Sequence, residues 1–91
     1  MADKNPTNKI LKIEDVVLSD SIFVKQGNNL DRIKLNEIRH LAAEANYTVI
    51  HLADRSYTER RILGEFEKKL IGKGFIRIHR SFIINLRFNL F

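Results

Sequence analysis

The sequence predicts a mainly β fold that contains one short helix. Residues 47–52 are rich in β-branched and aromatic side chains, which favour an extended backbone in a sheet. Residues 84–90 alternate apolar and polar side chains, which is the period of a β-strand with one buried face. Residues 63–71 instead place their apolar side chains at the spacing of one helix face. Together these patterns indicate a domain built mostly from short strands.

A β-hairpin is expected near the N-terminus. Residues 1–20 contain the single proline and many polar side chains, and we expect a leader or linker there, followed by a domain at residues 21–91. Residues 22–24 favour a strand, and the Gly-Asn-Asn sequence at residues 27–29 tolerates a positive φ in a turn. Apolar positions alternate again over residues 30–35, which is typical of a return strand.

Residues 33–45 have a conflicting pattern. Taken alone they predict a helix that ends at Asn46, because alanine and glutamate favour helix and five apolar residues fall at helical spacing: Leu35, Ile38, Leu41, Ala42 and Ala45. The β-rich segment at residues 47–52 follows directly. A turn at residues 54–56 then leads to a candidate partner strand at residues 57–60.

The helix over about residues 63–71 is the clearest single element. Leu63, Phe66 and Leu70 form its apolar stripe, acidic residues precede Lys68 and Lys69, and that order suits the helix dipole. Two glycines follow, which are common helix terminators. Two more strands are expected, at residues 75–78 and at residues 84–90, where the apolar positions are Ile84, Leu86, Phe88 and Leu90.

Composition excludes several functional classes. With 91 residues and no cysteine, the chain fits one small domain without disulfides or thiolate zinc sites, and it suits a reducing cytoplasm. No apolar run is long enough to span a bilayer. The three histidines are scattered without metal-ligand spacing, and neither a phosphate-binding loop nor a nucleophile motif is present. We therefore expect no enzyme, no cofactor, no metal and no membrane partner.

The positive charge is concentrated in the second half of the chain. Residues 1–54 contain seven basic and eight acidic residues, whereas residues 55–91 contain nine basic and three acidic residues, and the whole chain has a net charge of +5. Such a distribution fits either a solvated basic face or a surface that binds phosphates.

A cluster of three polar residues interrupts the apolar pattern at His79-Arg80-Ser81, between two predicted strands. An arginine can form a bidentate contact with guanine, and serine and histidine suit phosphate oxygens. The alternative is structural, with Arg80 paired to a surface acid and His79 capping a turn. The residues alone leave both interpretations open.

The segment FIRIHRSFIIN at residues 75–85 closely resembles the signature of LytTR DNA-binding domains, Phe-x-Arg-x-His-Arg-Ser followed by an apolar strand and an asparagine. Three further segments resemble the family in order and spacing: IFVK at residues 22–25, IKLNEI at residues 33–38 and ANYTVIHL at residues 45–52. The resemblance extends from residue 22 to about residue 88.

This resemblance implies an elongated arrangement of small antiparallel sheets with one short helix. It places a strand at residues 38–45, and we prefer that strand to the helix. It also implies the output module of a bacterial two-component transcription regulator, which follows a receiver domain and inserts loops into successive major grooves of double-stranded DNA. By resemblance, Asn46 and Arg80 would contact bases, whereas Tyr47, His79 and Ser81 would make phosphate or supporting contacts.

The sequence departs from the family pattern at its C-terminal end. Family domains continue through further strands, so we expect a domain truncated at Phe91 whose last strand has an open edge. An open edge favours self-association. The alternative function is therefore a protein-interaction or homo-oligomeric β module without DNA specificity. RNA binding through base stacking on Tyr47, Tyr57 and Phe82 is a third possibility, although their placement within apolar strands favours core packing.

Overall fold

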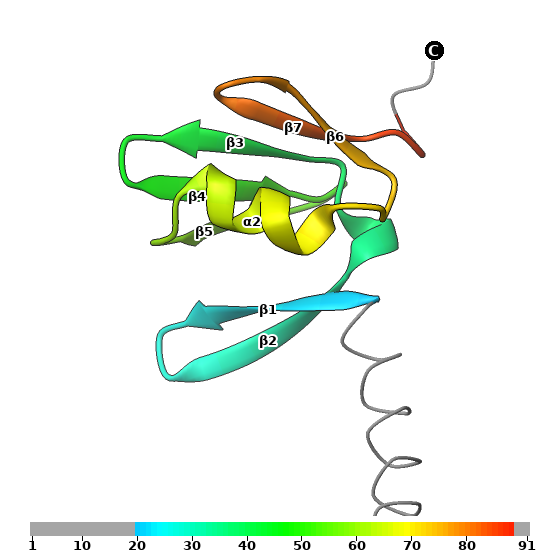
Figure 1. Cartoon of the computed structure of the whole chain (residues 1–91). Coiled ribbons are helices and arrows are strands. Elements are labelled where there is room, and N and C mark those ends of the chain that lie inside the picture. The colour runs from blue at the N-terminus through cyan, green and yellow to red at the C-terminus, as the bar shows by residue number, and fades with distance from the viewer. Residues whose placement is uncertain (1–19, 89–91) are drawn as a thin grey trace, which may run out of the picture.

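The computed structural model describes residues 20–88 and contains two antiparallel sheets and one α-helix (Figure 1). A two-stranded sheet pairs β1 with β2, and a five-stranded sheet has the order β5-β4-β3-β7-β6. Along the chain the elements are β1 (Ser21–Gln26), β2 (Asn29–Lys34), the 3₁₀ helix η1 (Leu35–Glu37), β3 (His40–Glu44), β4 (Tyr47–His51), β5 (Ser56–Glu59), α2 (Leu63–Leu70), β6 (Phe75–His79) and β7 (Phe82–Asn85). The expected mainly β fold with one short helix is confirmed.

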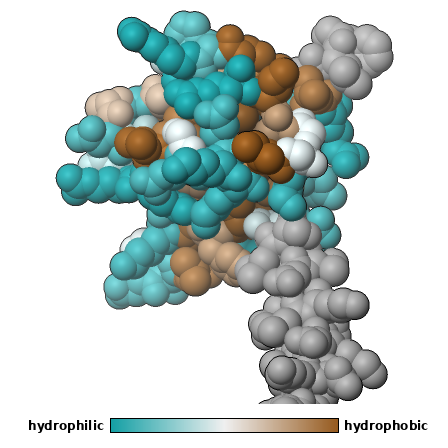
Figure 2. All heavy atoms as spheres, viewed as in Figure 1, coloured by the Kyte–Doolittle hydropathy of each residue, from teal (hydrophilic) through white to brown (hydrophobic). Residues whose placement is uncertain are grey.

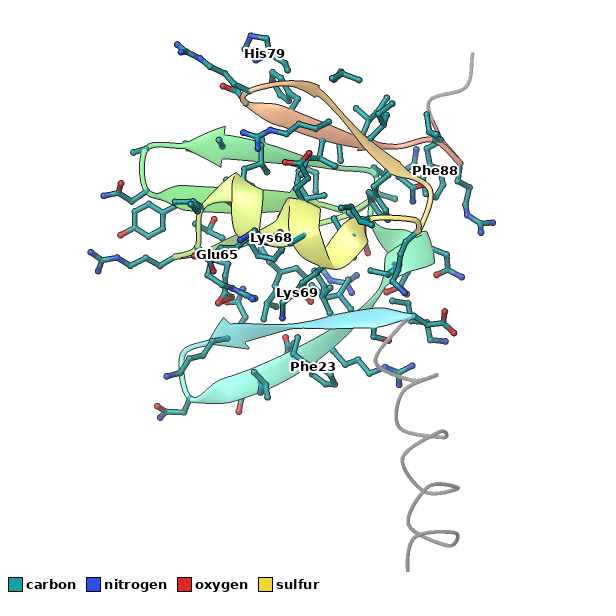
Figure 3. All side chains as sticks on the ribbon, viewed as in Figure 1. Phe23, Glu65, Lys68, Lys69, His79 and Phe88 are labelled. Carbon is teal, nitrogen blue, oxygen red and sulfur yellow. The ribbon has the colours of Figure 1, made fainter. Side chains whose placement is uncertain are left out.

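One hydrophobic core joins both sheets and the helix. The apolar stripe of α2 is buried as its spacing predicts, and it packs with side chains from the small sheet and from the facing side of the large sheet. The core consists of Ile22, Val24, Ile33, Ile38, Leu41, Ile50, Leu52, Leu63, Phe66, Leu70 and Ile83. Glu65 and Lys68 lie on the opposite, solvent-exposed side of α2 (Figure 3). Burial of the stripe, rather than helix propensity, stabilises so short a helix.

The expected hairpins are present. Ser21 pairs with Lys34 and Gln26 with Asn29, and Gly27 has a φ of 60° in the turn, where glycine has no steric penalty. β4 pairs with β5 as the sequence predicts. The helix ends at Leu70, and Gly72 adopts a φ of 74° just beyond it, which is a usual glycine position after a helix.

The helix that residues 33–45 favour in isolation does not form. Only Leu35–Glu37 is helical, as a single 3₁₀ turn, and residues 40–44 form β3. β3 lies at the centre of the large sheet, with β4 on one side and β7 on the other. Hydrogen bonding to two neighbouring strands satisfies its backbone, and this long-range pairing overrides the local preference for helix. The strand implied by the family resemblance is therefore correct.

The prediction of a long C-terminal strand at residues 84–90 is wrong. β7 ends at Asn85, and residues 86–88 form a turn in which the Asn85 side-chain oxygen accepts a hydrogen bond from the backbone N–H of Arg87 at 3.0 Å. Leu90 lies outside the described residues. The prediction of an open edge at this strand is also wrong, because β7 lies between β3 and β6. The edge strands of the large sheet are β5 and β6.

Arg61 connects the small sheet to the large one. Its guanidinium donates to the Phe23 carbonyl at 3.2 Å and lies 3.6 Å from the Glu59 carboxylate, whose other oxygen accepts from the Lys25 backbone N–H at 3.1 Å. The same guanidinium lies 4.5 Å from the ring centroid of Phe66. These contacts fix the β1–β2 hairpin against the end of β5.

No helix among residues 20–88 is long and apolar enough to cross a membrane. Apart from Asp20, the expected leader or linker at residues 1–20 lies outside the described part of the chain.

Candidate nucleic-acid interface

Four connections lie at one end of the molecule, which we call the loop end. They are the turn after Gln26, the turn at residues 45–46, the connection at residues 60–62 and the turn at residues 80–81. Thr48 pairs with Glu59 and Ala42 with Phe82, so the start of β4, the end of β5 and the start of β7 are adjacent. Figure 1 shows the β1–β2, β3–β4 and β6–β7 turns together on the left.

The β3–β4 turn presents two of the predicted site residues. Ala45 and Asn46 form the turn between Glu44 and Tyr47, which are paired, and both Asn46 and Tyr47 are exposed. Ala45 has a φ of 55°, the only positive φ of a non-glycine residue in the described region. The side chains of Asn46 and Tyr47 form no hydrogen bond with residues 20–88, so their polar groups are available to a ligand.

The β6–β7 turn presents the other three. The pairing of β6 with β7 is irregular between Arg77 and His79, and His79 pairs directly with Phe82 across the turn. His79 and Arg80 are exposed, and Ser81 is half-buried. Figure 3 shows the His79 side chain projecting from this turn, away from α2. The Arg80 guanidinium has no ion pair among the described residues, so the structural interpretation of Arg80 as the partner of a surface acid is wrong.

Hydrogen bonding defines the proton position of His79. Its Nδ1 atom accepts the Ser81 backbone N–H at 3.0 Å, so the structural interpretation of His79 as the cap of a turn is confirmed. A nitrogen that accepts a hydrogen bond carries no proton, so the neutral ring carries its proton on Nε2. Nε2 therefore presents a donor to solvent, which suits a phosphate oxygen.

Arg77 holds this turn in place. Its guanidinium donates to the Arg80 carbonyl at 2.6 Å, to the His79 carbonyl at 3.4 Å and to the Glu67 carboxylate of α2 at 2.9 Å. The sequence patterns predicted no role for Arg77. An arginine within an otherwise apolar strand was the available signal, because the opposite face of that strand is apolar.

The two turns are also directly connected. The Ala43 backbone N–H donates to the Ser81 carbonyl at 2.8 Å, which extends the β3–β7 pairing toward the loop end. All five predicted site residues, Asn46, Tyr47, His79, Arg80 and Ser81, therefore lie at one end of one sheet although up to 35 positions separate them in sequence.

The loop end is basic. Lys25, Arg60 and Arg80 are exposed there and form no ion pair with a described residue, whereas Glu44 is the exposed acidic residue beside them. Glu59 is neutralised by Arg61. Residue patterns did not predict Lys25 and Arg60 as members of this surface, because the β4–β5 register and the Lys25–Glu59 hydrogen bond that bring them there join segments far apart in sequence.

A second basic region lies at the opposite end, where a cavity of about 650 Å³ opens between η1, the α2–β6 connection and the turn after β7. Its lining includes one acidic residue, Asp20, and four basic ones: Arg32, Lys34, Lys73 and Arg87. None of the five predicted site residues lines it. Among residues 20–88 no group of three His, Asp or Glu side chains is arranged to hold a metal ion.

Comparison with known proteins identifies this architecture. The family model for the LytTr DNA-binding domain matches residues 28–88. The chain belongs to the LytTR family. A solved LytTr DNA-binding domain from a methyl-accepting/DNA response regulator of Bacillus cereus matches with a TM-score of 0.64 at 28% identity, covering 75% of this chain and 62% of that one.

Two curated LytTR proteins are similar to the chain. Transcriptional regulatory protein LytR of Staphylococcus aureus (strain bovine RF122 / ET3-1) is 31% identical over 85 residues, which are 93% of this chain and 35% of that protein. Sensory transduction protein LytT of Bacillus subtilis is 32% identical over 62 residues, which are 68% of this chain and 26% of that protein. The chain thus spans about a third of the curated regulators that it matches.

Proposed function

We propose that this chain is a non-enzymatic, sequence-specific binding module for double-stranded DNA that reads the major groove through its loop end. Asn46 and Arg80 contact base edges, and Tyr47, His79 and Ser81 contact phosphates or support the turns. The proposal rests on one observation above all: the sheet register and the Ala43–Ser81 hydrogen bond bring both turns, with the exposed and unpaired side chains of Asn46 and Arg80, to one basic end.

The chemistry of the two base-contacting residues is specific. The Asn46 amide offers a donor and an acceptor together, which match the N6 and N7 atoms of adenine. The Arg80 guanidinium offers two parallel donors, which match O6 and N7 of guanine. Lys25 and Arg60 contribute charge that attracts any phosphate backbone, so they add affinity without sequence preference.

Loops rather than the helix carry this interface. The apolar face of α2 is buried in the core, and a helix that packs in this way presents only its charged outer side. The exposed side chains of Asn46 and Arg80 instead project from two-residue turns. Such narrow projections can enter a groove without a recognition helix.

We further propose that residues 21–91 form the output module of a bacterial two-component regulator, that residues 1–20 are a linker, and that a receiver domain belongs to the same parent protein. The family membership and the regulatory names of LytR and LytT support this assignment. We expect the module to act on promoter repeats in the cytoplasm.

A mobility-shift series tests the function. An oligonucleotide pool selected on the wild-type protein supplies the specific site, and a shuffled duplex supplies the random one. We expect Arg80→Ala and Asn46→Ala each to weaken specific binding by roughly 1–3 kcal/mol and random binding by much less. Arg60→Ala should weaken both duplexes about equally, because a phosphate contact carries no sequence information.

Arg55→Ala is the matched control. Arg55 is exposed and lies at the opposite end of the sheet in the β4–β5 turn, where it pairs with Asp54 at 3.1 Å. It should leave both affinities unchanged. Equal losses on specific and random DNA for Arg80→Ala would remove its base-reading role, and a pool that yields no enriched sequence would contradict specific binding altogether.

A further inference from the structure

Two side chains connect the β6–β7 turn to α2. Nη1 of Arg77 donates to a carboxylate oxygen of Glu67 on α2 at 2.9 Å. Nη2 of the same guanidinium donates to the Arg80 carbonyl at 2.6 Å, and Nε donates to the His79 carbonyl at 3.4 Å. One guanidinium therefore links the helix to the backbone of two exposed residues of the turn.

The hydrogen-bonding groups of Arg77 are directed into the protein. Each of its three guanidinium nitrogens has an acceptor within residues 20–88, and its side chain is 28% exposed. The guanidinium also lies near α2 at a second position, because a Cβ atom at Gly64 would be 3.9 Å from Nη1. Arg77 thus differs from Arg80, whose exposed guanidinium has no ion pair among the described residues.

Glu67 balances the positive charge of Arg77. Figure 2 shows hydrophilic side chains both on the exposed side of α2 and at the β6–β7 turn. Of the two glutamates of α2, Glu67 is paired with Arg77, whereas Glu65 has no ion pair among residues 20–88. Because opposite charges in contact largely cancel at a distance, the positive charge that this turn presents to a phosphate backbone is that of Arg80.

The two sides of the turn are held by different contacts. On the β7 side, the Ser81 carbonyl accepts the Ala43 N–H at 2.8 Å, and the Ser81 N–H donates to the His79 ring at 3.0 Å. On the β6 side, the pairing is irregular between Arg77 and His79, and the guanidinium of Arg77 binds the carbonyls there. Loss of Arg77 would therefore release one side of the turn while the pairing from Phe75 to Arg77 remains.

We propose that Glu67 and Arg77 are positioning residues for sequence discrimination. They fix the backbone of the β6–β7 turn so that Arg80 meets a base pair in one orientation, and neither of them contacts DNA. This inference rests on the proposed function of the loop end. A bidentate contact with guanine requires two donors in register, and a contact residue of this kind needs support that fixes it to within about 0.5 Å. Attraction to phosphates depends mainly on charge and tolerates more movement.

The ratio of specific to random affinity tests the proposal, measured on the full chain by mobility shift with selected and shuffled duplexes. We expect Arg77→Ala to lower this ratio roughly tenfold and Glu67→Ala roughly threefold, because each loosens the turn that carries Arg80. Glu65→Ala is the matched control, since it removes the same charge from an exposed position of the same helix. It should leave the ratio unchanged, whereas an effect of net charge alone would be equal in the two glutamate variants.

Salt dependence distinguishes positioning from a phosphate contact. Loss of one phosphate contact lowers the slope of log affinity against log salt concentration by about one. We expect Arg60→Ala to lower the slope by this amount and Arg77→Ala to leave it unchanged. Arg77→Lys keeps the charge but not the three-way geometry, so it should lower the affinity ratio only in part, by roughly threefold.

A double-mutant cycle shows whether Glu67 acts through Arg77. In a protein that already has Arg77→Ala, we expect Glu67→Ala to reduce the affinity ratio no further. Circular dichroism checks the folding of each variant, and Arg77→Lys takes the place of Arg77→Ala in the cycle if the alanine variant does not fold. Independent losses that multiply in the double variant would give Glu67 a separate effect and overturn the proposal.

Two further outcomes would also overturn it: equal ratios for Glu67→Ala and Glu65→Ala, or a salt slope that falls by about one for Arg77→Ala. Failure of the proposed function is distinguishable. A wild-type protein that enriches no sequence would contradict both proposals. An enriched sequence with the expected Arg80→Ala loss, beside an unchanged ratio for Glu67→Ala, would contradict this one alone.

Discussion

The Nδ2 atom of Asn85 donates to the backbone carbonyl of Ile38 at 2.8 Å, across 47 positions of sequence. Its side chain also donates to the Leu35 carbonyl at 3.3 Å and accepts the Arg87 N–H at 3.0 Å. Asn85 is only 4% exposed, so these bonds satisfy backbone groups that have little access to water. One amide thereby fixes the segment that precedes β3 and the turn that ends β7.

We expect Asn85→Leu to lower the free energy of unfolding by roughly 2–4 kcal/mol. Leucine has a similar size but leaves the carbonyl of Ile38 and the N–H of Arg87 without partners. Urea denaturation measures the change, and Asn36→Ala, at an exposed position of η1, should cost less than about 0.5 kcal/mol. Equal stability of Asn85→Leu and wild type would show that these bonds contribute nothing net.

Arg77→Lys should disturb the β6–β7 turn more than it disturbs the fold. Lysine has one terminal nitrogen and cannot bind the Glu67 carboxylate and the Arg80 carbonyl in the same way as the guanidinium. Because the ion pair is partly exposed, we expect less than about 1 kcal/mol of lost stability. Amide hydrogen exchange at His79 to Ser81 should nevertheless accelerate several-fold. Unchanged exchange there would show that Arg77 does not hold the turn.

Ala45→Gly should stabilise the protein by about 0.5–1 kcal/mol. Ala45 adopts a φ of 55°, where a Cβ atom costs roughly 1–2 kcal/mol and glycine has no penalty, although glycine loses more chain entropy on folding. Thermal unfolding measures the change. Ala53→Gly, which lies in an exposed connection without a positive φ, should not stabilise. A loss of stability for Ala45→Gly would mean that the alanine conformation is not strained.

The His40–His51 pair should make stability depend on pH. The pKa of His40 is lowered in the folded state from its ordinary value of 6.5 by burial and then by His51, so the unfolded chain binds more protons just below pH 6.5. The free energy of unfolding should be highest above pH 6.5. It should fall as the pH decreases through 6.5 toward the lowered pKa of His40 in the folded state.

The substitution His40→Phe replaces the imidazole with a ring that does not titrate. It should make the decrease in the free energy of unfolding between pH 7.5 and pH 5.5 shallower. The neighbours of His40 on the adjacent strands are His51 and Ile84, so we expect no carboxylate there to oppose the effect. Denaturant melts at low protein concentration measure it. An identical pH slope for wild type and His40→Phe would contradict the assignment to this pair.

Sequence patterns predicted those elements whose signal is local. Val49 and Ile50 are in the expected strand, and Leu63 and Phe66 lie on the expected helix stripe. The family resemblance also corrected the helix expected around Leu41, where two neighbouring strands decide the structure and no local propensity contains that information.

The remaining differences arise from individual contacts that residue patterns do not show. The alternation from Ile84 onward suggested a long strand, but the Asn85 side chain bonds to the backbone of Arg87 and ends it, which a period count cannot detect. The resemblance predicted Asn46 and Arg80 as base-contacting residues, which stays a prediction. The structure adds Arg60 through the β4–β5 register, Lys25 through its backbone hydrogen bond to Glu59, and Arg77 through its hydrogen bond to the Arg80 carbonyl. Long-range register is what the sequence could not supply.

In the proposed complex with DNA, the hydrogen bond from Ala43 to Ser81 would also constrain the duplex. Because the two turns are joined through one sheet, their separation is fixed by the protein and cannot adapt to each sequence. In that complex the duplex would supply the adjustment through roll, twist and groove width. Sites with easily deformed pyrimidine–purine steps between the contacted base pairs would bind with less elastic cost. Base pairs that no side chain touches would thus contribute to the preferred sequence.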